Sequence, residues 1–136
     1  MTSGLLGDRY RVERKLGEGG MAEVFLVEDT LEKRRLALKR LKAGEPNREY
    51  FAHEFRVLAR LDHPNLVPVH DIGVDELGRP YFVMKLVEGR DLRAVFGCVW
   101  RGADGWTLPR ALDVLLKVCQ AVGYAHERGV IHRDLK

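Results

Sequence analysis

The stretch that decides the fold is His132-Arg133-Asp134-Leu135-Lys136, at the end of the 136-residue sequence. Taken alone, it reads as a charged tail. It follows a helical pattern and the apolar pair Val130-Ile131, and five defined residues in that setting are hard to obtain by chance. The segments upstream decide between the two interpretations.

A glycine-rich turn lies near the other end of the sequence. Gly17-Glu18-Gly19-Gly20 separates Tyr10–Leu16 from Ala22–Asp29, two short segments rich in Val, Phe and Leu, so a β-hairpin is predicted. A tight hairpin by itself explains glycines, which reach backbone angles that other residues avoid. The alternative is that the glycines let backbone N–H groups approach phosphate oxygens, with Val24 covering a base.

A lysine and a glutamate are predicted to form an ion pair. The third expected strand carries Lys39 and Arg40 side by side, and alternation alone does not say which of them faces a ligand. In the helical segment that follows, Glu54 falls on the same stripe as Phe51 and Leu58. A carboxylate on a packed face is costly unless it is paired, so we expect Glu54 to pair with Lys39. The alternative is a glutamate at the rim that reaches solvent.

The remaining pattern gives five strands, one helix between them, and a helical end. The strands are expected at Tyr10–Leu16, Ala22–Asp29, Arg34–Leu41, Leu66–Val74 and Arg79–Val87. A helix is expected between Asn47 and His63-Pro64-Asn65, a short one from Leu92 to about Val99, and a longer one over Thr107–Arg128. The apolar face of the last helix is expected to consist of Leu112, Leu115, Cys119, Val122 and Ala125.

Composition excludes several classes of protein. Apolar residues make up 46% and charged residues 32% of the chain, as in a globular domain, and a net charge of +3 from scattered residues indicates neither a nucleic-acid surface nor a membrane surface. Cys98 and Cys119 lack metal-ligand spacing and are expected to be small buried residues. With no leader-like start and no apolar run of about 18 residues, the expected location is the cytoplasm.

Taken together, the sequence resembles the eukaryotic-type protein kinase family, in its bacterial serine/threonine branch. The motifs that carry the resemblance are Gly17-x-Gly19-x-x-Ala22-x-Val24, Ala37-Leu38-Lys39, Glu54, His63-Pro64-Asn65 and His132-Arg133-Asp134. The resemblance implies an α+β, protein-kinase-like fold: a five-stranded antiparallel N-lobe sheet with one helix, then the first helices of an α-helical C-lobe. It places a lead-in at 1–9, the N-lobe with the ATP site and hinge at 10–87, and an incomplete C-lobe at 88–136.

The resemblance also implies phosphoryl transfer from ATP to a Ser or Thr hydroxyl of a protein substrate. Asp134 would accept the hydroxyl proton or orient the oxygen, and Lys136 would neutralise charge on the moving γ-phosphoryl group. Met84 would close the back of the adenine pocket, Lys85 and Val87 would offer backbone hydrogen bonds, and Asp91 would bind the ribose. The other expected ATP-binding residues are Gly17, Gly19, Gly20, Val24, Ala37, Lys39 and Glu54.

Two family elements have no counterpart in the 136 residues. The Asn that follows the catalytic Asp and the Asp-Phe-Gly motif would supply the Mg²⁺ ligands, so no metal ligand is assigned and transfer by this segment alone is expected to be very slow. The apolar stripe of the last helix predicts aggregation or a partner. A non-catalytic nucleotide-binding or regulatory module stays open as the alternative function, whereas the sequence at 132–136 disfavours a small-molecule phosphotransferase.

Overall fold

The structure of the protein is a computed structural model that describes residues 4–131. The chain divides into two units. The first comprises the described residues up to Asp62 together with Val67–Val87, and the second comprises His63–Leu66 and the described residues from Glu88 onward.

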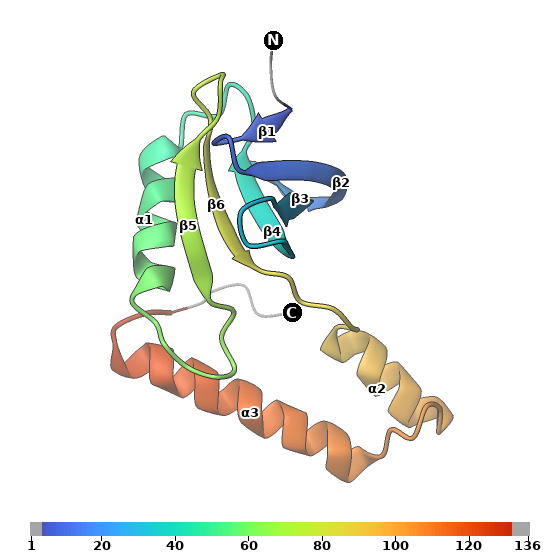
Figure 1. Ribbon diagram of the computed structural model, residues 1–136. Helices are drawn as coiled ribbons and strands as arrows, with labels where there is room; N and C mark the ends of the chain where they lie inside the picture. Colours follow the sequence, from blue (N-terminus) through green and yellow to red (C-terminus); the bar gives the residue numbers. More distant parts are fainter. Residues whose placement is uncertain (1–3, 132–136) are drawn as a thin grey trace. The chain divides into compact units, whose positions relative to one another are not determined.

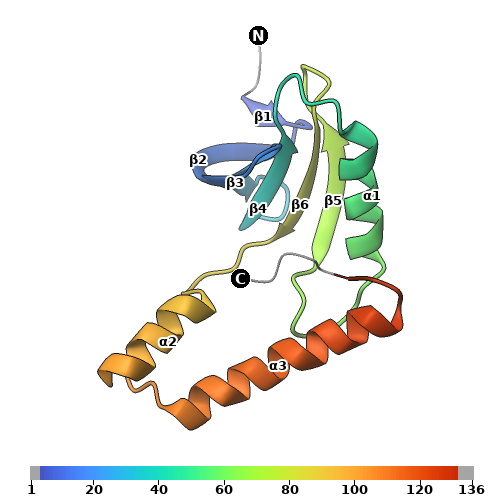
Figure 2. The same cartoon turned by 180° about the vertical axis from the view of Figure 1, so that it is seen from behind.

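The first unit is an antiparallel sheet with one helix (Figure 1). Its six strands follow the order β1-β2-β3-β4-β6-β5, seen from behind in Figure 2. Their bounds are Leu5–Leu6 (β1), Tyr10–Glu18 (β2), Ala22–Asp29 (β3), Arg34–Leu41 (β4), Val69–Val74 (β5) and Pro80–Lys85 (β6). The sequence prediction of five strands is corrected by β1, which pairs with β2. A strand of two residues is too short to show the alternation by which strands are recognised.

One face of the sheet is covered by the helix α1, Arg48–Ala59, which lies along β5 and β6 (Figure 1). Its apolar residues recur at helical spacing, and Phe51 is fully buried against the sheet. Burying a phenylalanine side chain of this kind contributes about 2–3 kcal/mol. The buried cluster on this face consists of Ala22, Leu41, Phe51 and Phe82.

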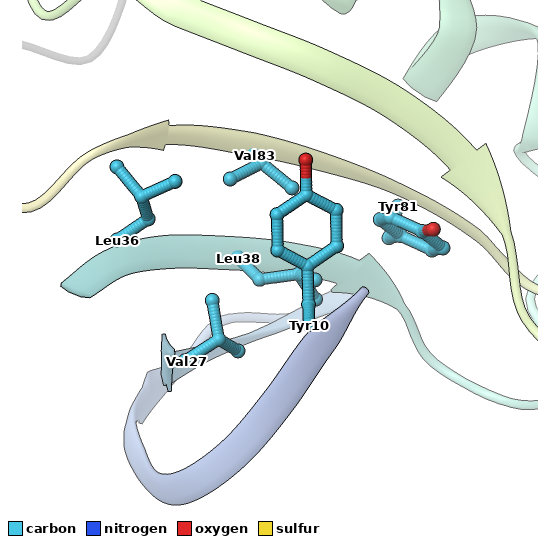
Figure 3. Packing of buried hydrophobic residues seen from close by; sticks show 6 residues of the cluster. All are labelled: Tyr10, Val27, Leu36, Leu38, Tyr81 and Val83. Atoms are coloured by element: carbon cyan, nitrogen blue, oxygen red, sulfur yellow. The ribbon is translucent and has the colours of Figure 1, made fainter. Parts of the chain in front are cut away.

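The opposite face has a second core, which Figure 3 shows from close by. Side chains from four strands meet there, and the cluster consists of Tyr10, Val27, Leu36, Leu38, Tyr81 and Val83. The rings of Tyr10 and Tyr81 meet edge to face with centroids 6.3 Å apart. The Tyr10 hydroxyl donates to the Asp71 carboxylate over 2.7 Å, which ties β2 to the distant strand β5.

The second unit contains two capped helices, α2 over Leu92–Arg101 and α3 over Leu108–Glu127. The Asp91 side chain caps α2 by accepting from the Ala94 N–H over 2.8 Å, and Thr107 caps α3. Gly102 ends α2 with φ of 65°, a conformation that favours glycine. The His63 ring lies 5.1 Å from that of Tyr124, so the segment His63–Leu66 packs on α3.

The prediction of burial holds for one cysteine and is wrong for the other. Cys98 is buried in α2, whereas Cys119 is exposed in α3. Leu112 and Leu115 of the expected apolar face are exposed as well. Only Ala111 and Ala121 of α3 are buried, because few of the described elements pack against this helix. Among residues 4–131, no helix is both long and apolar enough to cross a membrane.

Candidate functional site

The register of the sheet gathers several predicted residues on the face that α1 covers. Lys39 lies opposite Val24 of β3 on one side and opposite Phe82 of β6 on the other. Ala37, two residues before Lys39, lies opposite Met84. Because side chains of directly paired residues share a face, these five residues lie on one surface of the sheet.

The ion pair expected from the sequence is present. Lys39 Nζ lies 2.9 Å from Glu54 Oε1, and the two side chains are 26% and 30% exposed. Partial burial limits solvent screening, so this pair restrains the lysine more than a fully exposed pair would. The ammonium also lies 5.7 Å from the centroid of the Phe82 ring. The lysine is thereby held over the sheet with its remaining donors available.

Arg40, the neighbour of Lys39, lies on the opposite face. Its guanidinium stacks 4.8 Å from the centroid of the Phe25 ring and contacts the carboxylates of Glu23 at 3.4 Å and Asp75 at 3.6 Å. Its Nε is buried without a hydrogen-bond partner in the described structure. Arg40 is therefore part of the charged network on the outer face, and Lys39 is the cation on the α1 face.

The glycine turn between β2 and β3 does not need glycine for its own conformation. Gly17, Gly19 and Gly20 are absent from the positions with positive φ. A Cβ added at any of the three would meet no atom within 4 Å. The turn closes through the Gly19 N–H, which donates to the Ala22 carbonyl over 2.9 Å. A tight hairpin therefore does not explain these glycines well. The open space beside their backbone N–H groups is instead what a bound anion requires.

An ion pair ties the turn to β4. Glu18 Oε2 lies 3.0 Å from Lys42 Nζ, and this contact lowers the pKa of the Glu18 carboxyl group. The Lys42 N–H also donates to the Met21 carbonyl over 2.8 Å. The turn is therefore held against Lys42, the residue that directly follows β4.

The remaining predicted residues fall in three places. The Lys85 N–H donates to the Pro68 carbonyl over 3.0 Å, so this N–H is already used, and the Val87 side chain is exposed. Asp91 belongs to the second unit, where its carboxylate caps α2. Asp134 and Lys136 lie outside the described residues. Their roles, like that of Asp91, stay predictions.

A cavity of about 300 Å³ opens elsewhere in the first unit and contains none of the predicted residues. It is lined by Leu41, Lys42, Ala43, Gly44, Glu45, Arg48, Leu77, Arg79 and Pro80. Two of its three cations are already paired, Lys42 with Glu18 and Arg79 with Asp75. The cavity is therefore not the site that the motifs indicate.

Residues 4–131 include no group of three or more His, Cys, Asp or Glu side chains that could hold a metal ion. These residues alone therefore offer no ready-made ligand set for Mg²⁺. The Lys39 ammonium and the open glycine backbone, by contrast, are groups that fit a phosphate chain.

Sequence reasoning did not single out Phe82. It recognised residues 81–84 as a central strand, and alternation from Met84 would have put Phe82 on the Met84 face. The pairing of Phe82 with Lys39 depends on the register between β4 and β6, which is a tertiary property.

Several protein kinases are similar to this chain. A mutant kinase domain of Mycobacterium tuberculosis PknI superimposes with a TM-score of 0.69 at 34% identity, covering all of this chain and 56% of that one. A probable serine/threonine-protein kinase, PknB of Corynebacterium glutamicum, is 42% identical over 97% of this chain and 21% of its own length. Serine/threonine-protein kinase PksC of Streptomyces coelicolor is 39% identical over 97% of this chain and 25% of its own.

The chain thus spans about a fifth to a quarter of these two curated relatives. The family described as the protein kinase domain matches residues 10–136, which is nearly the whole sequence. The matched region contains β3, β4 and β6, which carry Val24, Lys39 and Phe82, and the helix α1, which carries Glu54. The chain belongs to the protein kinase domain family.

Proposed function

We propose that the first unit binds ATP and that the protein containing this chain is a serine/threonine protein kinase. The observation that carries the proposal is the Lys39–Glu54 ion pair, 2.9 Å long, on the face of the sheet next to the glycine turn. An ammonium group fixed by a carboxylate retains donors for phosphate oxygens. Bacterial relatives with serine/threonine kinase names support the substrate class.

Each residue of the site has a task in this proposal. The backbone of Gly17, Gly19 and Gly20 approaches the phosphates, Lys39 binds them, and Val24 and Ala37 enclose the adenine. Met84 bounds the pocket from behind, while Lys85 and Val87 contribute backbone groups. Asp91 is assigned to the ribose, and Asp134 and Lys136 to the transfer itself. ATP would supply the phosphoryl group, and Mg²⁺ would need ligands from outside the described residues.

Ligand-induced stabilisation tests the binding step. At ten times Kd, an ATP analogue should stabilise the protein by about 1.4 kcal/mol, which raises Tm by roughly 5 °C for a chain of this size. Lys39→Met should abolish this shift because the phosphate partner is lost. Arg40→Met is the matched control: it removes a cation next in sequence but on the other face, so the shift should persist even if Tm itself falls. No shift with folded wild type would contradict the proposal.

Catalysis by residues 1–136 alone is expected to be very slow, since neither an Asp-Phe-Gly motif nor the Asn of the catalytic loop occurs in them. Transfer of labelled phosphate from ATP to a generic protein substrate measures this directly. Rapid transfer by the segment would contradict the expectation, whereas binding without transfer is also what a non-catalytic nucleotide-binding module would show. No separate observation favours the non-catalytic module over the kinase.

Two further expectations from the sequence stay predictions. The exposed Leu112 and Leu115 of α3 offer an apolar surface to a protein partner or to further residues of a longer chain. The cytoplasmic location rests on the sequence alone.

A further inference from the structure

We propose that Phe82 is a positioning residue for the Lys39–Glu54 ion pair, supporting the lysine and the helix that carries the glutamate with the same ring. The inference rests on the proposed function, because its consequence is measured on bound nucleotide. Phe82 itself is not placed in contact with phosphate. It acts through Lys39.

The Phe82 ring lies next to the Lys39 ammonium group. Phe82 and Lys39 are direct register partners on β6 and β4, so their side chains rise from the sheet next to each other. The ammonium lies 5.7 Å from the ring centroid, and Phe82 is 1% exposed. The electron-rich face of an aromatic ring attracts a cation at this distance, and more strongly where water is excluded.

The same ring also packs against α1. Phe51 precedes Glu54 in the helix and Phe55 follows it. Their ring centroids lie 5.1 Å and 5.9 Å from that of Phe82. Both pairs are tilted at 39° and 44°, in the range where aromatic rings attract one another. The helix is therefore fixed to β6 on both sides of the residue that must reach Lys39.

These contacts give the ion pair a shared support. A lysine side chain has four rotatable bonds, and a single carboxylate leaves the ammonium free to pivot about that contact. A second contact with a buried ring reduces that freedom before any ligand binds. The lysine side chain then loses its conformational entropy during folding rather than during binding. Phosphate therefore binds more tightly to the preorganised ammonium group. Adenosine, which has no phosphate, gains nothing from this order.

The measurement is the ratio of the dissociation constants for adenosine and for ATP, obtained by titration calorimetry on the same protein. Phe82→Leu keeps an apolar side chain and removes the ring, so the ratio should fall about 3- to 10-fold. Using a ratio cancels losses common to both ligands, such as a general weakening of the pocket. If the leucine variant does not fold, Phe82→Met, which is closer in volume, carries the same expectation.

Two further variants separate positioning from packing. In a Lys39→Met background, titrated at nucleotide concentrations high enough to measure its weakened ATP binding, Phe82→Leu should leave the ratio unchanged, because the residue through which Phe82 acts is missing. Phe25→Leu is the matched control: Phe25 is an aromatic residue that supports Arg40 on the opposite face, so its loss should leave the ratio as in wild type.

The outcomes distinguish the two proposals. If ATP binds and Lys39→Met lowers the ratio while Phe82→Leu and Phe82→Met do not, the positioning role is overturned and the proposed function stands. An equal fall for Phe25→Leu, or an undiminished effect of Phe82→Leu without Lys39, also overturns it. If wild type does not bind ATP, the proposed function fails and the inference fails with it.

Discussion

Asp29, the last residue of β3, has a fully buried side chain that is surrounded by hydrogen-bond donors. Its two carboxylate oxygens accept from Arg9 Nε over 2.8 Å and from Arg9 Nη2 over 2.7 Å. Oδ1 also accepts from the N–H groups of Leu31 and Glu32, at 3.0 Å and 3.2 Å. One side chain therefore fixes both the β3–β4 turn and the segment before β2.

Two replacements separate these contributions. Asp29→Asn retains an oxygen for the turn N–H groups but loses the charge, and should lower the free energy of unfolding by about 2 kcal/mol. Asp29→Ala removes every acceptor and should cost about 4 kcal/mol, within the range for breaking a buried pair from one side. The difference between the two values reflects the N–H groups of Leu31 and Glu32, which keep an acceptor in Asp29→Asn and lose it in Asp29→Ala.

Urea unfolding, followed by circular dichroism, measures the effect as a fall in the midpoint at constant slope. Glu32→Gln is the control: its carboxylate lies 3.7 Å from Arg9 but is 52% exposed, so the change should stay within about 0.5 kcal/mol. If Asp29→Asn is no more destabilising than Glu32→Gln, the assignment of stability to the buried carboxylate is refuted.

The pH dependence has a defined sign. The hydrogen bonds from Arg9 hold the pKa of the Asp29 carboxyl group well below its usual range, since they stabilise the charged form. A depressed folded-state pKa stabilises the fold above the unfolded pKa of about 3.9, and this contribution is lost as pH falls toward the folded-state pKa. The gap between wild type and Asp29→Asn should be constant near neutral pH and shrink below about pH 4.

Two more predictions concern Tyr10, in the second core on the sheet face opposite α1, and the glycine turn. Tyr10→Phe removes the hydrogen bond to Asp71 and should lower the free energy of unfolding by about 1 kcal/mol in urea titrations, whereas Tyr50→Phe, at an exposed position without a hydrogen bond in the described structure, should have no effect. Gly19→Ala should leave Tm unchanged or slightly raised but weaken binding of an ATP analogue, because the added methyl group enters open space that the phosphates need. Gly7→Ala should do the reverse, lowering Tm without changing nucleotide affinity, since φ is 58° and its Cβ would collide with the Tyr81 hydroxyl. Equal binding losses for the two glycine variants would contradict this account.

Most strands and all three helices were predictable from the sequence because local rules define them. Strand β4 begins and ends where its pattern places it, at Arg34 and Leu41. The helix stop and start signals likewise put the last helix between Thr107 and Arg128, and α3 covers Leu108–Glu127. Strand β1 and the exposure of Cys119 were not predictable, since one is too short for a pattern and the other depends on what packs against α3.

The importance of Asp29 was also not visible in the sequence. An aspartate at a strand end is an ordinary turn residue. Only the fold brings Arg9, twenty residues earlier, within bidentate reach of it. Long-range contacts of this kind have no local pattern.

By itself, the sequence determined that Glu54 faces the sheet and requires a cation, because helical periodicity and the cost of an unpaired buried carboxylate are local matters. It also determined the family through its motifs. The sequence also predicted Lys39 as this cation, but alternation could not show which of Lys39 and Arg40 faces α1, and the tertiary structure decided that. Alternation places Lys39 and Arg40 on opposite faces of the sheet without saying which face each takes. Because α1 packs on the face that carries Phe82, Lys39 is the cation that lies beneath the helix.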